Sequence, residues 1–281
     1  MTTIRRRHHK HRPHSKLAER RKKLLMFKIG GIAGFILLVA TGIVFGLRAE
    51  KINITDINIK GNSALATKAL KGFAEEKISG NYALVLPKSS ILLYPRKNLQ
   101  ATLLESFKEI KEVNVSYESL QSISINIEER VPHALYCGNQ VSTTTDCYFL
   151  DEDGLIFTKA PEFSGNVYLR YFGALAGDTT IGNQFMLVED FRETNFFLMS
   201  LFELGLKPII FSIVNNDDFE VELESGGKIM FGKKQNLSDI YENIQSVFGS
   251  EEFNEDSLEV LEYADFRFGN KVYFKFKESE E

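Results

Sequence analysis

The chain has 281 residues, a net charge of −4, 43% hydrophobic residues, two cysteines and no tryptophan. This hydrophobic content can build a core, which excludes a wholly disordered chain, and two cysteines exclude a disulfide-dense scaffold. The charge is uneven, because residues 1–28 carry +10 and the rest of the chain carries −14. We therefore expect a basic head and an acidic body that meet different environments.

The basic head, residues 1–23, has almost no apolar residue before Leu17 and is predicted to be a disordered cytoplasmic tail. A nucleic-acid-binding tail and a metal-binding tail that uses its four histidines are the alternatives. A basic run beside a transmembrane helix is first a topology signal and a contact for lipid headgroups. We therefore expect the head to meet the lipid bilayer, and we expect no nucleic acid as a partner.

Residues 24–47 are predicted to form a transmembrane helix, because residues 29–47 are an uncharged apolar run. At ~1.5 Å per residue this run spans ~28 Å, close to the hydrocarbon core of a bilayer. A buried core helix usually carries a polar stripe, and the apolar region of a cleaved signal peptide is shorter. The sequence therefore predicts an uncleaved signal anchor. The N-terminus would lie in the cytoplasm, and the C-terminal part would lie on the opposite, outer side of the membrane.

Residues 52–130 are predicted to form a small α+β domain of the order β-α-α-β-β. Alternating apolar residues indicate the strands, and apolar residues at helical spacing indicate the helices. Pro132 lacks a ladder donor and marks the end of this domain. The predicted elements are a strand at 52–59, helices at 66–80 and 99–110, and strands at 113–117 and 123–127.

Residues 131–277 are predicted to form a second, mixed and strand-rich domain with flanking helices, followed by an acidic tail at 278–281. In the last strand, Val272, Phe274 and Phe276 alternate with lysines and a tyrosine. The predicted strands are 147–150, 155–158, 209–214, 219–224, 228–232, 258–268 and 271–277, and the predicted helices are 186–204 and 237–248.

No catalytic motif is recognisable in this sequence. His133 is the one histidine after the apolar run, which excludes a multi-histidine zinc centre there. The Ser-x-x-Lys spacing at 225–228 contains two glycines between predicted strands, which indicates a hairpin turn. The acidic run Asp151–Asp153 is interpreted as a solvated hairpin tip. We therefore expect no enzymatic activity, no metal and no cofactor; a membrane-tethered peptidase or wall hydrolase is the alternative.

Cys137 and Cys147 are a candidate disulfide pair, because nine residues separate them and two neighbouring strands could bring them together. The loop-entropy model gives such a bond on the order of 2–3 kcal/mol. Two buried free thiols are an equally good interpretation, so the sequence leaves the pairing open.

The last predicted strand, Lys271–Lys277, is a candidate open edge of the sheet, because the acidic residues after it are too polar to extend the sheet. An open edge can recruit a strand from another chain, and Tyr273 offers an aromatic anchor. The alternative is that the lysines only protect this edge from aggregation.

Three segments, in this order and spacing, resemble the FtsQ/DivIB family of bacterial cell-division proteins. They are residues 125–132 (INIEERVP), 148–157 (YFLDEDGLIF) and 264–273 (ADFRFGNKVY). The acidic turn in the second segment is one residue longer than usual in the family, and the third has Ala-Asp-Phe-Arg in place of Val-Asp-Leu-Arg. The resemblance implies a POTRA domain at 52–130 and the family's β domain at 131–277.

The resemblance also implies a function and partners. It implies a non-catalytic scaffold in the cell membrane at the division septum, which binds FtsB-like and FtsL-like (DivIC-like) coiled-coil proteins and other divisome membrane proteins and helps to control septal peptidoglycan synthesis. A POTRA-type polypeptide transport or assembly module is a further alternative. The partner-binding residues that the resemblance implies are Phe266, Arg267, Phe268, Lys271, Val272, Tyr273 and Lys275.

Overall fold

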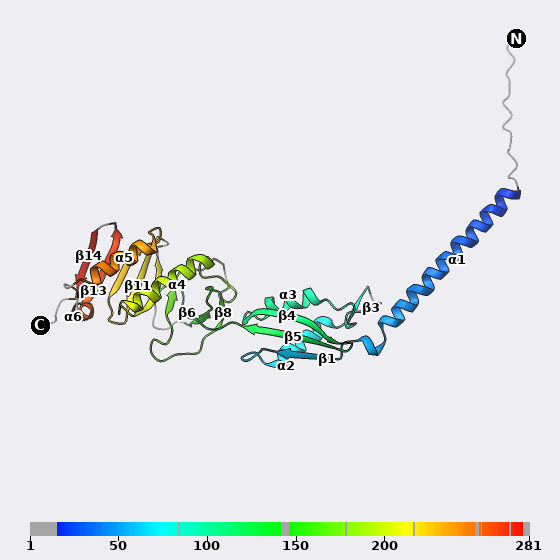
Figure 1. Ribbon diagram of the computed structural model, residues 1–281, viewed down its shortest axis with the longest axis horizontal. Coiled ribbons are helices and arrows are strands. Elements are labelled where there is room, and N and C mark those ends of the chain that lie inside the picture. The colour runs from blue at the N-terminus through cyan, green and yellow to red at the C-terminus, as the bar shows by residue number, and fades with distance from the viewer. Residues whose placement is uncertain are drawn as a thin grey trace, which may run out of the picture. The chain divides into compact units, whose positions relative to one another are not determined.

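The computed structural model describes residues 16–83, 85–141, 146–177, 179–215, 217–250, 253, 255–269 and 271–277 (Figure 1). Residues 1–15 of the predicted basic tail and the acidic tail 278–281 lie outside the described residues. The chain divides into two compact units. The first unit contains the chain up to Lys60, Thr67–Leu99 and Val115–Ile125, and the second contains Gly61–Ala66, Gln100–Asn114 and Asn126–Glu281.

The first helix, α1 (Lys16–Leu47), contains the predicted apolar span. Its segment Glu19–Leu47 is long and apolar enough to cross a membrane. The prediction of disorder through residue 23 is wrong for residues 16–23, which are helical. These residues are mostly Lys, Arg, Leu, Ala and Glu, which favour helix, and extending an existing helix needs no new nucleation.

The chain after α1 forms a small sheet with two helices. Among the described residues this sheet has three strands in the order β1-β5-β4. The elements are η1 (Glu50–Ile52), β1 (Asp56–Lys60), α2 (Thr67–Ile78), α3 (Arg96–Ser106), β4 (Ile110–Ser119) and β5 (Ser122–Glu129). A short hairpin that the sequence did not predict, β2 (Asn81–Tyr82) and β3 (Leu86–Pro87), lies between the helices.

The periodicity of the sequence explains these elements. In α2 the residues at spacing four, Leu70, Ala74 and Ile78, are buried, as one face of a helix requires. In β5 the buried residues include Ile123, Ile125 and Ile127 at spacing two, as one face of a strand requires. The two predicted helices and the predicted strands of this region are therefore present. The first strand begins later than predicted, at Asp56, because Ile52 lies in the 3-10 helix η1.

The second unit contains a large sheet, which has nine strands within the described residues in the order β14-β13-β12-β11-β10-β9-β6-β7-β8. The pairs β6–β9, β9–β10 and β12–β13 are parallel, and the other neighbouring pairs are antiparallel. The strands are β6 (Ala134–Tyr136), β7 (Tyr148–Leu150), β8 (Ile156–Lys159), β9 (Arg170–Phe172), β10 (Pro208–Val214), β11 (Asp218–Leu223), β12 (Lys228–Gly232), β13 (Leu261–Phe268) and β14 (Lys271–Phe276).

Two long helices, α4 (Val188–Glu203) and α5 (Leu237–Phe248), pack against this sheet (Figure 1). A single apolar cluster joins them to the strands; it includes Phe191 and Phe197 of α4, Ile244 of α5, and Phe211 and Phe231 of the sheet. Rings in this cluster meet edge to face, as at Phe197 and Phe231, whose centroids are 5.1 Å apart. The prediction of an N-terminal apolar helix followed by an α+β, strand-rich body is confirmed.

One predicted strand begins too early. Leu258 lies in a short helix, α6 (Glu255–Glu259), and β13 begins at Leu261. Leu261 is fully buried whereas Val260 is half exposed. Leu258 and Val260 alternate as in a strand, but they are one residue out of step with Leu261, the first residue on the buried face of β13.

Candidate protein-binding site

The strand β14 lies at one end of the large sheet. Among the described residues it pairs with β13 alone, so its outer side is an open edge whose backbone groups can pair with another strand. The pairing with β13 is antiparallel, with Ala264 opposite Phe274 and Asp265 opposite Tyr273. The predicted last strand therefore occupies the predicted place.

The direction of the backbone groups along β14 follows from one hydrogen bond. The N–H of Lys277 donates to the carbonyl of Val260, just before β13. The pairing of β13 with β14 has two register shifts, and each adds one extra residue to β13. The strand β14 is therefore regular, and its N–H groups alternate in direction. The amides of Val272, Phe274 and Phe276 therefore point toward the open edge, and those of Tyr273 and Lys275 point toward β13.

One face of β14 packs on the domain. The ring of Phe274 lies 5.2 Å from that of Phe253 and 6.3 Å from that of Phe248 in α5, and Val272 packs against the same apolar cluster. This packing fixes one face of β14 on the domain, so a partner strand would meet an edge that is already formed.

The opposite face exposes an aromatic pair. Tyr273 is 51% exposed and Phe268 is 57% exposed, and their rings meet edge to face at 5.2 Å. Exposed aromatic side chains beside an open edge are typical of binding hot spots. The structure thus brings together two of the residues that the family resemblance implied.

Arg267 is held by two carboxylates next to this pair. Its Nη2 donates to Asp265 Oδ2 (2.6 Å) and its Nη1 to Asp218 Oδ2 (2.7 Å). Burial disfavours the ionised form of Asp265, but the hydrogen bonds from Arg267 outweigh it, so the pKa of this carboxyl lies below its ordinary value. The guanidinium is already paired with two carboxylates, so Arg267 links β13 to Asp218 of β11 and is largely engaged within the domain.

Lys275 is paired with Glu262 across the hairpin (2.8 Å), with both side chains about half exposed. The hydrogen bond to Glu262 raises the pKa of Lys275. Such exposed pairs contribute little to stability. Lys271 is exposed at the start of β14. Both lysines therefore flank the edge from its solvent side.

The prediction that Phe266 binds a partner is wrong. Its side chain is 1% exposed and belongs to the apolar core, so it cannot touch a partner. The register shift between Asp265 and Phe268 is the reason. An extra residue in a strand breaks the alternation of faces, which turns Phe266 inward and Phe268 outward.

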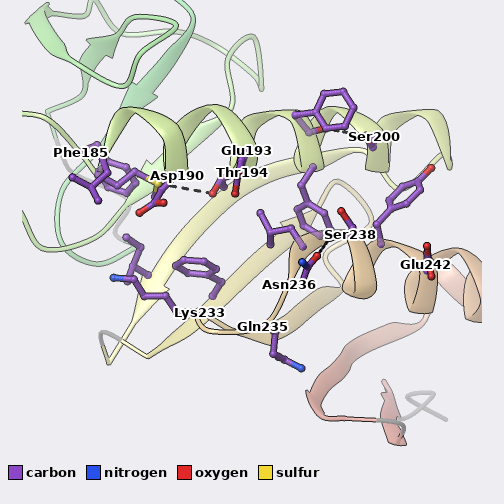
Figure 2. A pocket seen from close by; sticks show the side chains of 18 of the residues that line it. Phe185, Asp190, Glu193, Thr194, Ser200, Lys233, Gln235, Asn236, Ser238 and Glu242 are labelled. Atoms are coloured by element: carbon purple, nitrogen blue, oxygen red, sulfur yellow. Dashed lines mark hydrogen bonds between the residues drawn. The ribbon is translucent and has the colours of Figure 1, made fainter.

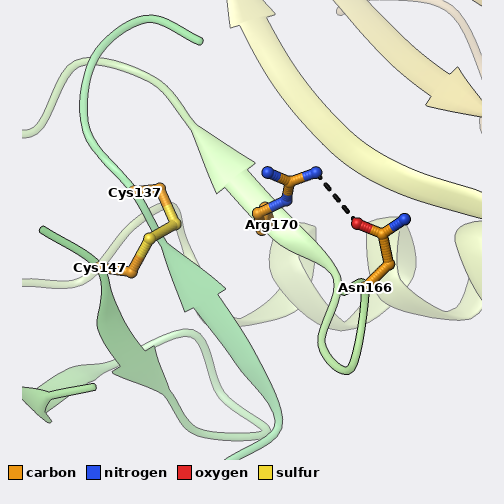
Figure 3. The surroundings of a disulfide bond; sticks show 4 residues. All are labelled: Cys137, Cys147, Asn166 and Arg170. Atoms are coloured by element: carbon orange, nitrogen blue, oxygen red, sulfur yellow. Dashed lines mark hydrogen bonds between the residues drawn. A yellow bond between two sulfur atoms is a disulfide. The ribbon is translucent and has the colours of Figure 1, made fainter. Parts of the chain in front are cut away.

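Cys137 and Cys147 are joined by a disulfide in the structure, with their Cα atoms 4.2 Å apart (Figure 3). The bond links the residue after β6 to the residue before β7. Cys137 is buried and packs with Leu135, Phe172 and Ile210. Of the two alternatives that the sequence left open, the structure contains the bonded one.

The acidic run at 151–153 is not a solvated tip throughout. Asp151 is buried and pairs with Arg130, and its Oδ1 accepts the N–H groups of Asp153 and Leu155 (both 2.9 Å). The sequence interpretation is therefore wrong for Asp151. Short-range spacing (Asp followed by a turn and Gly154) suggests an Asx-type turn, but the partner Arg130 lies 21 residues earlier and gives no local signal.

The neighbouring residues extend this network. Asp153 accepts two hydrogen bonds from Arg192 of α4, and Lys111 pairs with Glu152 (2.7 Å). Gly154 has a φ of +78°, and a Cβ there would lie 2.7 Å from the ring of Phe191. The hairpin tip is thus a fixed structural element and not a free acidic loop.

The other candidate motifs are structural. Residues 225–228 join β11 to β12, with Gly226 at a φ of +82°, as a hairpin turn requires. His133 is exposed, and its backbone N–H donates to Leu150. In the part of the chain that the structure describes, no group of three or more His, Cys, Asp and Glu side chains is placed to hold a metal ion.

No protein-family model matches the chain, and no curated protein matches it.

Proposed function

We propose that this protein is a non-catalytic scaffold of the bacterial divisome, of the FtsQ/DivIB type, anchored in the cell membrane by α1. Its N-terminus lies in the cytoplasm, and the part of the chain after α1 works on the outer side of the membrane, at the division septum. There it gathers other division proteins and helps to control septal peptidoglycan synthesis. The residue motifs at 125–132, 148–157 and 264–273 support this proposal.

The order of elements supports the finer assignment of domains. The succession β1, α2, α3, β4 and β5 is compatible with a POTRA-like domain, with the hairpin β2–β3 as an insertion. The large sheet with α4 and α5 is compatible with the family's β domain. The disulfide between Cys137 and Cys147 supports an oxidising, extracytoplasmic location for this part of the chain.

The observation that carries the proposal is the open, regular and firmly packed edge of β14. Strand addition uses backbone groups for affinity and neighbouring side chains for specificity. Here the amides of Val272 and Phe274 supply the backbone groups, and Tyr273 and Phe268 supply exposed aromatic surface. The partners we propose for this edge are the FtsB-like and FtsL-like coiled-coil proteins of the same organism.

The test is to replace Val272 by proline. This substitution removes an N–H that points to the open edge and places a ring in the path of an incoming strand, while an edge strand tolerates it. We expect Val272→Pro to weaken binding of the full-length protein to the FtsB-like partner at least about tenfold, equivalent to about 1.4 kcal/mol. Binding is measured by titration of the detergent-solubilised proteins.

Two matched variants complete this experiment. Val272→Ala shortens the same side chain but keeps the N–H, so binding should stay within about threefold of the wild type. Tyr273→Pro removes an N–H that points to β13, so it should loosen the hairpin itself. Wild-type affinity in a folded Val272→Pro protein would show that the edge of β14 does not carry the function.

The location is tested separately. Alkaline phosphatase fused after Glu281 should be active, because that enzyme needs an oxidising compartment, and a fluorescent fusion should gather at the septum during division. Activity of a cytoplasmic reporter at the same position, or a diffuse envelope signal throughout the cell cycle, would contradict the proposal.

A further inference from the structure

A cleft of about 900 Å³ lies between α4 and α5 in the second unit (Figure 2). Side chains of both helices and of the segment after β12 line it. Its base contains Phe185, Phe197 and Phe219, which are all nearly fully buried. The cleft is distinct from β14 and from every residue of the proposed strand-binding edge.

The charged side chains around the cleft are mostly acidic. Asp190, Glu193 and Glu203 of α4 and Glu242 of α5 line it, against a single cation, Lys233. Figure 2 shows Asp190, Glu193, Glu242 and Lys233 around the opening. Among the described residues none of these four carboxylates forms an ion pair, whereas Asp153, Asp218, Glu220 and Glu262 in the same unit are each paired with a cation.

The rim of the cleft is apolar as well as acidic. Leu187 and Phe196 line it and are 70% and 76% exposed. Farther along α4, Met199 and Phe202 are also exposed. Large exposed apolar side chains gathered on one helix indicate a surface that a partner covers. The uncompensated carboxylates beside them determine which partner fits, because complementary charge steers association and excludes partners of like charge.

We propose that this cleft binds a cationic amphipathic helix of another protein. The apolar side of the helix would cover Leu187 and Phe196, and its lysines or arginines would lie against Asp190, Glu193, Glu203 and Glu242. Helices bind in apolar grooves through residues at spacing three and four, and two flanking helices offer such a groove. This surface would allow the protein to hold a second partner while β14 holds the first.

The experiment uses the full-length protein in nanodiscs of zwitterionic lipid and a labelled model peptide. The peptide has about 18 residues, roughly five helical turns, with leucines on one face and lysines on the other; a second peptide has glutamates in place of the lysines. Fluorescence anisotropy is measured with empty nanodiscs as the background. We expect saturable binding of the lysine peptide, weaker binding at high salt, and no binding of the glutamate peptide.

Two variants locate the binding. Glu193→Lys with Glu242→Lys should weaken binding of the lysine peptide at least about tenfold. The matched control, Glu75→Lys with Glu105→Lys, changes the net charge equally on exposed positions of α2 and α3 and should leave binding unchanged. Equal binding of both peptides, equal loss in both variants, or no binding above the empty nanodiscs would overturn the proposal. The β14 variant Val272→Pro should bind the peptide normally, so the two surfaces are tested independently.

Discussion

The two ends of the large sheet differ in how their edges are protected. At β8 a following segment of the chain covers the start of the edge. Ile156 donates to Asn183 (2.9 Å) and accepts from Gly182 (2.7 Å), and Leu155 bridges to Gln184. At β14, no backbone hydrogen bond from outside β13 and its flanks reaches the strand among the described residues. Natural proteins usually cover or charge their edges. Within the described part of the chain the edge of β14 is not covered, and its lysines Lys271 and Lys275 discourage non-specific pairing while its backbone groups stay accessible to a partner strand.

The structure also reinforces the two ends differently. Near β8, the largely buried pair of Arg130 and Asp151 fixes the hairpin of β7 and β8, and the disulfide fixes the neighbouring connection between β6 and β7. Near β14, Lys275 and Glu262 are about half exposed, and Arg267 is about a third exposed although its partner Asp265 is buried. We infer that the closed end of the sheet, at β8, contributes stability and that the open end, at β14, contributes binding.

The largest effect is expected for Asp151→Ala. The side chain of Asp151 is 4% exposed and that of Arg130 17%, so the change leaves a largely buried guanidinium without its carboxylate partner. Removal of one member of such a pair costs about 3–5 kcal/mol. The measurement is the free energy of unfolding from denaturant titration.

The matched control is Glu152→Ala. Glu152 pairs with Lys111 in a largely exposed position, and exposed pairs contribute about 0–1 kcal/mol. If the two variants lose equal stability, the pair of Asp151 and Arg130 does not stabilise the β8 end of the sheet more than an exposed pair does.

A smaller effect is expected for removal of the disulfide. The double variant Cys137→Ala with Cys147→Ala should lose about 2–3 kcal/mol, because the bond closes a short loop of the unfolded chain. Reduction of the wild-type protein should shift its unfolding midpoint by a similar amount and should leave the double variant unaffected. A reductant that changes neither protein would indicate that the disulfide does not stabilise the domain.

The smallest effect is expected at the open end, for Asp265→Asn, at about 1–2 kcal/mol. Because the pKa of Asp265 is lowered in the folded protein, its contribution is fully present above the unfolded pKa of about 3.9. That contribution is lost as the pH falls through the lower, folded pKa. Wild type and variant should therefore differ in stability at pH 6 and converge toward pH 2. A difference that stays constant across this range would contradict the role of the carboxylate.

Local periodicity made much of the fold predictable. The apolar run after the basic head lies in one long apolar helix, and the isoleucines of β5 and the alternation of β14 each mark a face that packs on the core, as predicted. The strand-rich body follows from the same patterns. These features need only near neighbours in the sequence.

The candidate site was less predictable, because it depends on pairing between distant residues. The register shift in β13 places Phe266 and Phe268, which would share a face in a regular strand, on opposite faces, and no local pattern indicates an extra residue in a strand. Asp151 was misread because its partner, Arg130, lies in another element. The acidic cleft requires α4 and α5 to lie side by side, which their separate periodicities do not specify.

The most direct test of the central claim is residue-resolved amide exchange along β14 with and without the FtsB-like partner. In the free protein the amides of Val272, Phe274 and Phe276 should exchange fast, and those of Tyr273 and Lys275 should exchange slowly, because only the latter face β13. Partner binding by strand addition should protect the first three amides and leave the other two unchanged. Saturated binding with no added protection at Val272, Phe274 and Phe276 would contradict the claim that the edge of β14 receives the partner.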